Sequence, residues 1–407
     1  MVDVMAGIRV LEIAEHTFVP AASAILADWG ADVIKIEHAE RGDAMRGLTT
    51  TGVMDLGEGK VHVLLEHSNR GKRSLGVDLS TAEGQAIIHR LAANCDVFLT
   101  NKTPRVRERL GLDRSSLREH NPDIIYVCGS GWGQRGPDAN RGGYDVLGYW
   151  CRSGLAYGAR PVELAEPPQQ PAPAYGDSIG AMTIAGGICA ALLHRQRTGE
   201  ALDVDISLLS TGMWAGSAGI ALSLQTGQPW AQREPDRIVR NPLTEMYRTS
   251  DDRWLMFSCL QAFEYWPDMC QLVERPELIA DERFCNHDRL TENAPTAVAL
   301  LRQEFVRRTF DEWRTRAASF RGQWSPVLTS VEIADDPQVT ANGYVGHLRT
   351  KDGIPFRLIT TPVQFGGEPN QPTRAPEFNE HGDEILTTEL GMDWEHLIDL
   401  KVRGVIA

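Results

Sequence analysis

The residues best suited to chemistry lie in the segment 175–180, which reads Tyr-Gly-Asp-Ser-Ile-Gly. It holds the carboxylate of Asp177 and the hydroxyl of Ser178, and either side chain can act as a nucleophile in covalent catalysis. The apolar run that follows, 179–193, ends in a basic stretch and Gly199, a pattern that predicts a buried helix with a glycine stop. We therefore expect Asp177 or Ser178 at the N-terminus of a helix.

Two other interpretations of this segment stay open. Asp177 can be an N-cap whose side chain accepts hydrogen bonds from the first N–H groups of the helix, a role worth roughly 1 kcal/mol. The segment also matches G-x-S-x-G, the nucleophile-elbow pattern of serine hydrolases. That elbow needs a strand running into the serine, whereas residues 166–174 are rich in proline, which cannot donate regularly to a sheet. Ser178 is thus the weaker candidate.

Composition limits the ligands that the protein can use. The chain has 407 residues, enough for more than one domain, and a net charge of −14, which disfavours nucleic acid and anionic membranes as partners. An anionic ligand has to be bound by local basic clusters. The seven cysteines include no C-x-x-C pair, which favours reduced thiols and indicates no metal site. We expect a cytoplasmic protein, because no secretory signal opens the chain and the run 179–193 is shorter than the roughly 20 residues that span a bilayer.

Alternating strand and helix patterns in the first 130 residues must position these side chains. Residues 8–13 form a strand-like apolar run, residues 20–29 are helix-like, and residues 32–37 form a second apolar run, which together predict a parallel β-α-β unit. The rhythm continues with expected strands at 74–78, 96–100 and 124–128 and expected helices at 81–93 and 105–109. The prediction is an α/β fold with an open, Rossmann-like parallel sheet.

A glycine-rich loop follows this unit. It contains G-x-G-x-x-G at Gly131, Gly133 and Gly136, but the loop runs into proline and turn residues instead of a helix, so the dinucleotide-binding fingerprint lacks its context. Further on, residues 246–259 predict two strands that turn at 251–252, and residues 263–273 are helix-like. The expected domains are a large α/β domain at 1–225, a smaller α+β domain at 226–330, and a C-terminal segment at 331–407 that returns to the large domain.

Short segments spread over nearly the whole chain suggest a family. They are residues 7–12, 26–37, 69–74, 109–112, 129–137, 143–145, 176–177, 197–199, 375–377 and 380–381. None is specific alone, but in order and spacing they resemble the family III CoA-transferases, which include formyl-CoA transferase, carnitine CoA-transferase and α-methylacyl-CoA racemase. The resemblance implies an acyl-CoA:carboxylate CoA-transferase that uses coenzyme A as acyl-CoA, with an acyl-CoA donor and a carboxylic-acid acceptor. It also implies an interlocked-ring homodimer.

The same resemblance assigns roles around the nucleophile. It makes Asp177 the residue that attacks the donor thioester, giving a mixed anhydride and then an aspartyl-CoA thioester, at a helix N-terminus whose N–H groups suit oxyanions. Tyr144 and Asp145 correspond to a family pair beside the acyl group. The resemblance implies that Tyr144 forms a hydrogen bond with the ligand and that Asp145 supports the active-site loop. A buried core tyrosine is the competing interpretation of Tyr144. The chain has Thr17, Phe18 and Val19 where relatives commonly carry Gln-Ala-Gly or Leu-Ala-Gly, a change that crowds the acyl pocket.

The phosphates of CoA need cations, and two basic segments at expected strand ends can supply them. The first contains Arg70, Lys72 and Arg73, and the second contains Lys102, Arg105, Arg107 and Arg109. Solvated surface charge is the alternative for both. The resemblance places Asn101 and Arg109 at the CoA site, and it places His38 where a basic residue often contacts the nucleotide.

The segment at 143–145 separates the branches of the family. The racemase branch carries a histidine where this chain has Tyr144, and a tyrosine is a poor base at neutral pH. A racemase is therefore the alternative to the transferase, followed by a serine hydrolase and a non-catalytic CoA-binding protein.

Overall fold

The computed structural model describes residues 3–48, 61–161, 164–230 and 239–407. The chain divides into two compact units, one formed by Met1–Gln232 with Pro337–Ala407 and the other by Arg233–Asp336. The C-terminal segment thus belongs to the same unit as the N-terminal one. All the residues discussed below as candidate site residues belong to the first unit.

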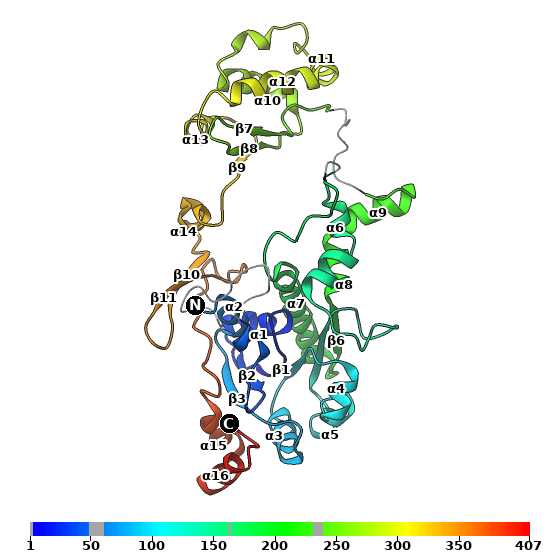
Figure 1. Ribbon diagram of the computed structural model, residues 1–407, viewed down its shortest axis with the longest axis vertical. Helices are drawn as coiled ribbons and strands as arrows, with labels where there is room; N and C mark the ends of the chain where they lie inside the picture. Colours follow the sequence, from blue (N-terminus) through cyan, green and yellow to red (C-terminus); the bar gives the residue numbers. More distant parts are fainter. Residues whose placement is uncertain (1–2, 49–60, 162–163, 231–238) are drawn as a thin grey trace. The chain divides into compact units, whose positions relative to one another are not determined.

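A six-stranded parallel sheet forms the centre of the first unit (Figure 1), in the order β3-β2-β1-β4-β5-β6. The strands are β1 (Arg9–Ile13), β2 (Asp32–Glu37), β3 (Arg73–Gly76), β4 (Val97–Thr100), β5 (Ile125–Ser130) and β6 (Asp203–Ser207). This is the doubly wound order, in which the chain builds outward from β1 on both sides. The predicted Rossmann-like sheet is confirmed. Strand β6 was missed, although its Asp-Val-Asp-Ile-Ser sequence alternates as a strand does.

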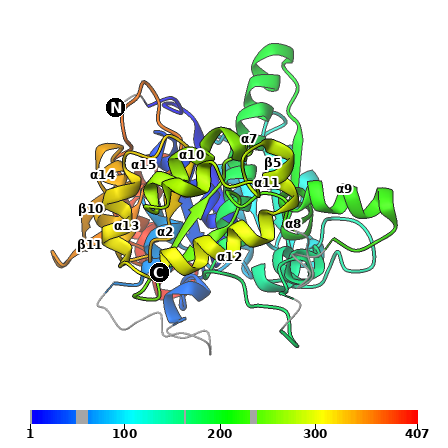
Figure 2. The same cartoon turned by 90° about the horizontal axis from the view of Figure 1, so that it is seen from above.

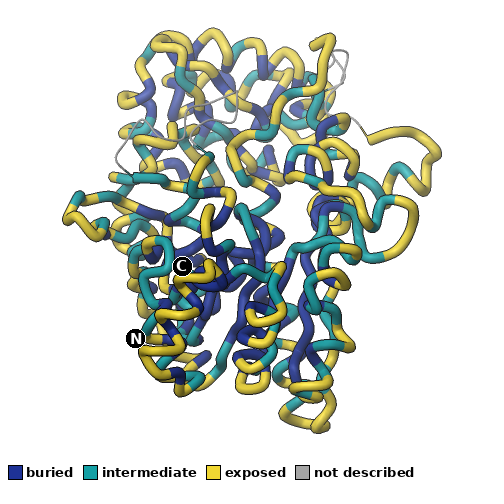
Figure 3. Tube along the Cα trace, turned by 60° about the horizontal axis from the view of Figure 1, so that its bottom comes forward, coloured by how far each residue is buried: buried dark blue, intermediate teal, exposed yellow. Residues whose placement is uncertain are grey.

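The sheet is covered on both faces, because neighbouring strand residues point to opposite sides. Val10 packs with helices α1 and α7, whereas Leu11 packs with helices α3, α5, α15 and α16. Figure 3 shows the buried strands in dark blue between exposed turns. The first unit contains the helices α1 (Phe18–Asp28), α2 (Val63–Asn69), α3 (Ala82–Ala92), α4 (Pro104–Arg109), α5 (Arg114–His120), α7 (Tyr175–Thr198), α15 (Gly382–Leu390) and α16 (Trp394–Val402). It also contains α6 (Leu155–Gly158), α8 (Leu208–Ala215), α9 (Ser217–Thr226) and α14 (Pro337–Ala341).

Helix α7 carries Asp177 in its first turn. It begins after Ala174, whose φ of 55° reverses the chain, and it ends at Gly199 with φ of 78°, the predicted glycine stop. Ile184 and Ile188 lie fully buried in the core. With 24 residues, α7 is longer than the apolar run suggested, and by length and composition it could cross a membrane. The core helix of a globular protein meets the same criterion.

The second unit combines a small antiparallel sheet with helices, as expected for an α+β domain. Its strands β7 (Met246–Arg248), β8 (Trp254–Phe257) and β9 (Trp324–Pro326) pair in the order β7-β8-β9. The predicted turn at 251–252 joins β7 to β8, and the helix-like stretch forms α10 (Ala262–Leu272). The other α-helices described here are α11 (His287–Glu292), α12 (Ala294–Phe305) and α13 (Phe310–Ala317).

Candidate active site

Two cavities meet where the chain leaves β1 and β4 at their carboxyl ends. Both are lined by Glu15, Lys102 and Val106, which follow these two strands. In doubly wound sheets the ligand crevice lies at this point, because the connections from adjacent strands diverge to opposite faces. We call the first the basic cavity, about 400 Å³, and the second the carboxylate cavity, about 300 Å³.

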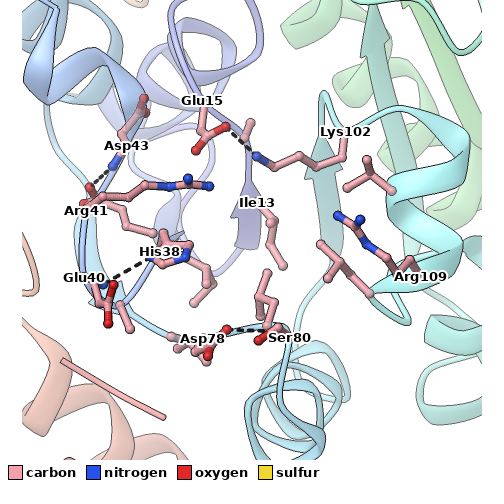
Figure 4. A pocket seen from close by; sticks show the side chains of 18 of the residues that line it. Ile13, Glu15, His38, Glu40, Arg41, Asp43, Asp78, Ser80, Lys102 and Arg109 are labelled. Carbon is pink, nitrogen blue, oxygen red and sulfur yellow. Dashed lines mark hydrogen bonds and ion pairs between the residues drawn. The ribbon is translucent and has the colours of Figure 1, made fainter. Parts of the chain in front are cut away.

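The basic cavity gathers basic side chains from several strand ends (Figure 4). They are His38 and Arg41 after β2, Lys102 after β4, and Arg109 at the end of α4. Lys102 pairs with Glu15, its Nζ lying 2.5 Å from Oε2, and the Nδ1 of His38 accepts a hydrogen bond from the backbone of Glu40. His38, Lys102 and Arg109 were predicted as CoA contacts. Arg41 was missed, although it is a basic residue just beyond a strand end.

The other predicted basic segment does not form a cluster at this cavity. Arg70 pairs with Asp28 at 2.9 Å, and Lys72 is fully buried with its Nζ 2.6 Å from Glu12. Arg73 begins β3 and pairs with Asp32, the first residue of β2, so it lies at the amino ends of the strands.

Two predicted residues of the second segment have structural partners. Arg107 is buried and donates to the hydroxyl of Tyr126 and to Oε1 of Gln134. Asn101 lines the carboxylate cavity, where its amide donates to the carbonyl of Glu15 at 2.7 Å and accepts from the Glu15 N–H at 3.2 Å. Asn101 thereby holds the ends of β1 and β4 together beside both cavities.

The carboxylate cavity contains the predicted nucleophile and part of the predicted acyl pocket. Asp177, Tyr144, Asp145 and Phe18 line it. Tyr144 is 63% exposed, so the alternative of a buried core tyrosine is wrong. Thr17 and Val19 are buried beside Phe18 and do not line the cavity.

Close packing fixes the first turn of α7 at the cavity wall. A Cβ on Gly176 would lie 2.1 Å from the ring of Tyr149, and a Cβ on Gly180 would lie 2.3 Å from the ring of Phe18. Both distances are too short for any side chain, so the two glycines allow the helix to approach its neighbours. The glycines of the G-x-S-x-G match therefore serve packing, and the segment is helical instead of a strand-to-helix elbow.

Asp145 caps α7 from a distant part of the chain. Its Oδ2 accepts from the Gly176 N–H at 3.1 Å and from the Gln170 amide at 3.2 Å, and the Asp177 N–H also donates to the Asp145 carboxylate. The suggestion that Asp177 is the N-cap is therefore wrong, since Ala174 holds that position and Asp145 supplies the carboxylate. The amides of Gly176 and Asp177, which could have stabilised an oxyanion, already have this acceptor.

Burial and a neighbouring charge make Asp177 difficult to ionise. Burial, and then the charge of Asp145, raise the pKa of Asp177 to about 8. Burial also raises the pKa of Asp145, against the hydrogen bonds that it accepts. No hydrogen bond from the described residues stabilises the charged form of Asp177. A carboxylate in this state is an effective nucleophile once ionised, because its charge is poorly solvated.

His16 is a cavity residue that the sequence did not reveal. Its backbone is left-handed, with φ of 67°, and its N–H donates to Oδ1 of Asp43 at 3.0 Å. Its ring packs edge-on against the ring of Tyr144, with centroids 5.6 Å apart. Such a backbone conformation is uncommon outside glycine and is often kept at functional sites. Its only sequence signal is a position three residues past the end of β1.

Ser178 has a histidine partner but little else that a hydrolase needs. Its Oγ lies 3.1 Å from Nε2 of His67 on α2. Burial, and then the nearby Arg70, lower the pKa of His67 to about 4, which makes its imidazole a weak base. Ser178 is not among the residues that line the carboxylate cavity. The serine-hydrolase interpretation is not favoured by this geometry.

Comparison with known proteins assigns the chain to one family. The sequence model described as CoA-transferase family III matches residues 5–382. The chain belongs to CoA-transferase family III. As a member of this family it is an enzyme that uses acyl-CoA as a co-substrate, and the basic cavity offers cations suited to the phosphates of CoA.

Individual relatives agree with this assignment. The chain is 27% identical to the (R)-2-hydroxy-4-methylpentanoate CoA-transferase of Clostridioides difficile over 98% of both chains. It is 28% identical to the succinate–glutarate CoA-transferase of Agrobacterium fabrum over 94% of both. Among solved structures, a CAIB/BAIF family protein from Brucella suis matches with a TM-score of 0.79 and 27% identity, over 95% of this chain and 99% of the other.

Proposed function

We propose that the protein moves CoA from an acyl-CoA donor to a carboxylic-acid acceptor, with Asp177 as the nucleophile. One observation carries this proposal. Asp177 lies half-buried at the wall of a cavity that joins a second cavity lined by His38, Arg41, Lys102 and Arg109, and no described residue donates a hydrogen bond to its carboxylate. This arrangement supports a role for Asp177 at the acyl end of an acyl-CoA molecule and for the basic side chains at its phosphate end.

The reaction follows from the chemistry of a carboxylate nucleophile. A carboxylate oxygen of Asp177 attacks the thioester carbonyl, the C–S bond breaks, and CoA leaves as a thiolate from a mixed anhydride. The thiolate attacks the aspartyl carbonyl of the anhydride, releasing the donor acid and forming an aspartyl-CoA thioester. The acceptor carboxylate attacks this thioester to give a new anhydride and thiolate, and the thiolate then takes the new acyl group and frees Asp177.

The relatives leave the class of acid open. One is named for a hydroxylated acid and another for two dicarboxylic acids. Both kinds of acid carry the carboxylate that the proposed chemistry needs. We therefore base the proposed reaction on the carboxylate alone.

The test is direct chemical detection of both transfer and intermediate. The purified protein is incubated with an acyl-CoA and a panel of free acids, and new thioesters are followed by mass spectrometry. In a second arm, acyl-CoA is added without acceptor, then hydroxylamine, and the protein is digested. We expect a hydroxamate at Asp177, because hydroxylamine traps activated aspartyl groups. Transfer without any modification at Asp177 contradicts the assigned nucleophile.

A racemase is the second candidate, and His16 favours it. Two bases on opposite sides of a substrate carbon can exchange its proton, and His16 with Asp177 in one cavity offers such a pair. The racemase branch carries its histidine base at the position of Tyr144, and this chain has none there. That argument does not apply to His16, which lies elsewhere in the sequence. Deuterium entering a 2-methylacyl-CoA in D₂O without any acceptor acid, and without CoA transfer, decides for the racemase.

We also propose a homodimer, with chains that interlock as in the family. Helix α9 (Ser217–Thr226), which follows α8 (Leu208–Ala215), has no buried residue in this chain, and both views show it extending away from the sheet (Figures 1 and 2). Trp214 and Leu224 are 78% and 79% exposed. Large apolar side chains at such exposure mark an interface. Sedimentation at micromolar concentration, with Leu224→Glu as the disrupting variant, tests the assembly.

A further inference from the structure

Arg141 is a cation of the carboxylate cavity that the proposed reaction does not yet use. Among the described residues that line this cavity, lysine and arginine occur as Lys102 and Arg141. Lys102 is paired with Glu15, whereas the ion pair of Arg141 with Asp138 is long, 3.9 Å from Nη1 to Oδ1. A carboxylate oxygen at that distance accepts no hydrogen bond, and Arg152 holds the other oxygen of Asp138. Arg141 therefore has N–H donors available for an anion.

The loop that carries Arg141 is held at the cavity by its own contacts. The N–H of Arg141 donates to the carbonyl of Asp138 at 2.9 Å, and Nε1 of Trp132 donates to the carbonyl of Gly142 at 3.2 Å. The guanidinium carbon lies 5.4 Å from the centre of the Trp132 ring, within the range of a cation–π interaction. The backbone of Arg141 is thus fixed, and an aromatic ring orients its exposed side chain more than a carboxylate does.

The proposed reaction brings an anion into a cavity that already holds carboxylates. Glu15, Asp145 and Asp177 line it, and the acceptor acid is itself a carboxylate at neutral pH. Repulsion and desolvation therefore oppose its entry, and a cation at the cavity wall reduces both costs. The charges that shift the pKa of Asp177 do not include Arg141, so this cation leaves the nucleophile unneutralised.

We infer that Arg141 binds the carboxylate of the free acceptor acid at the carboxylate cavity and so supplies the acid to the aspartyl-CoA thioester at Asp177. This inference rests on the proposed CoA-transfer function. An exposed cation raises the rate at which an anion enters a cavity, and the planar guanidinium matches a carboxylate with two parallel N–H···O bonds. Because every acceptor shares the carboxylate, the contribution of Arg141 is the same whatever the rest of the acid is.

The test measures the two halves of the reaction separately in Arg141→Gln, with acetyl-CoA as the donor. The kcat/KM for acetyl-CoA reports formation of the aspartyl-CoA thioester, and the kcat/KM for the acid reports its consumption. We expect kcat/KM to fall about tenfold for each of propionate, lactate and phenylacetate, the effect of one hydrogen bond to a charged group. The kcat/KM for acetyl-CoA is expected to change by less than about twofold, because Asp177 is untouched. Hydroxylamine is an uncharged substitute for the acid, so the hydroxamate at Asp177 should form at the wild-type rate.

Two further variants locate the effect. Arg152→Gln is the matched control, because its guanidinium also lies over the Trp132 ring, 4.8 Å from the centre, but Arg152 is not among the residues that line the cavity. We expect it to keep both kcat/KM values near those of the wild type. Arg141→Lys keeps the charge without the planar fork, so it should recover part of the kcat/KM for the acids. Salt at about 300 mM should reduce the difference between Arg141→Gln and the wild type.

The outcomes separate this inference from the proposed function. An unchanged kcat/KM for the three acids in Arg141→Gln, or a loss confined to one of them, overturns the binding of a shared carboxylate. An equal loss for acetyl-CoA and the acids, with slower hydroxamate formation, shows that Arg141 supports the structure of the site and also overturns it. The same follows if the wild type forms the hydroxamate but transfers CoA to none of the three acids. A wild type that forms neither new thioesters nor the hydroxamate overturns the proposed function itself.

Discussion

The first unit contains two groups of charged side chains that behave in opposite ways. In the buried network, Lys35 pairs with Glu12 at 2.8 Å and with Asp43 at 2.7 Å, and Lys72 pairs with Glu12 at 2.6 Å. In the carboxylate cavity, the charge of Asp145 acts on Asp177, and no cation of the described residues offsets its effect on the pKa of Asp177. Burial opposes ionisation in both places. In the network Lys35 and Lys72 outweigh burial and lower the pKa of Glu12, whereas in the cavity the second carboxylate raises the pKa of Asp177 further.

The contrast teaches which buried charges are structural. Paired charges hold the loops in place: Lys35 also donates to the carbonyl of Ala14, and Asp43 accepts from the N–H of His16. The network therefore fixes the segment that presents His16 to the cavity. A buried carboxylate without a cation lowers the stability of the fold and holds no loop in place. Such carboxylates are kept where the chemistry of the site needs them.

The largest expected effect is the loss of chemistry at the unpaired carboxylate. Asp177→Asn removes the nucleophile and keeps the shape, so the rate of CoA transfer is expected to fall by at least about 10³-fold. The hydroxylamine-sensitive adduct should disappear with it. Ser178→Ala is the matched control on the adjacent residue, and we expect it to retain transfer and the adduct. The opposite outcome, with Ser178→Ala inactive and Asp177→Asn active, would make the serine the nucleophile.

The second effect falls on the paired network and on stability. Glu12→Gln leaves two buried lysines without their shared carboxylate, so the free energy of unfolding is expected to fall by about 3 kcal/mol or more, measured by urea denaturation at pH 7. Glu15→Gln is the control, because Glu15 pairs with Lys102 near the surface, where an ion pair contributes about 1 kcal/mol or less. Equal losses of unfolding free energy in both variants would show that the buried ion pairs of Glu12 stabilise the fold no more than the ion pair of Glu15 near the surface.

Asp177→Asn is expected to act in the other direction on stability. The carboxyl of Asp177 stays protonated in the folded chain up to about pH 8, whereas in the unfolded chain it ionises near pH 4, at the usual aspartate pKa of about 3.9. The wild type therefore loses stability relative to the variant as the pH rises through this window. Urea denaturation at pH 5 and pH 9 should show the variant gaining on the wild type, and a constant difference would mean that the pKa of Asp177 is not raised.

Much of this arrangement follows from local sequence, and some of it does not. The alternating apolar runs identified the parallel strands because buried strands must be apolar whatever their neighbours are. Asp177 was found because a short helix-start signal precedes a long apolar run. The burial of Lys72 could not be predicted in this way, since its partner Glu12 lies on strand β1, 60 residues earlier in the chain. Asp145 caps α7 from about thirty residues upstream, and no local pattern marks that contact.

The third effect is on the pH dependence of kcat/KM, which we expect Asp177 and Asp145 to set. Asp177 must be ionised to attack, so kcat/KM is expected to rise about tenfold per pH unit below pH 8 and to level off above it. Asp145→Asn removes the charge that, among the described residues, raises the pKa of Asp177, so the midpoint should move to lower pH. Rates measured from pH 5.5 to 9 with one donor and acceptor test this. A midpoint that the substitution leaves unchanged would mean that the charge of Asp145 does not affect the pKa of Asp177.

The smallest expected effect extends the comparison to cations. Arg109 lies exposed at the basic cavity (Figure 4). Lys72 is buried in the network, so of these two residues only Arg109 can meet a phosphate. Arg109→Ala is expected to raise the Kd of CoA about fivefold at low salt, because a solvent-exposed charge pair contributes about 1 kcal/mol. Arg105→Ala provides the control, since Arg105 is exposed on the same helix α4 and does not line the cavity. The Kd of CoA is measured by calorimetric titration at 20 mM and 300 mM salt. If Arg109 contacts a phosphate, screening should reduce the difference in Kd between Arg109→Ala and the wild type at the higher salt. The control variant should keep a Kd near that of the wild type at both. Equal Kd values for both variants at low salt would mean that Arg109 is a surface charge that does not contact CoA. Lys102, Arg41 and His38 would then remain as the basic residues proposed to bind its phosphates.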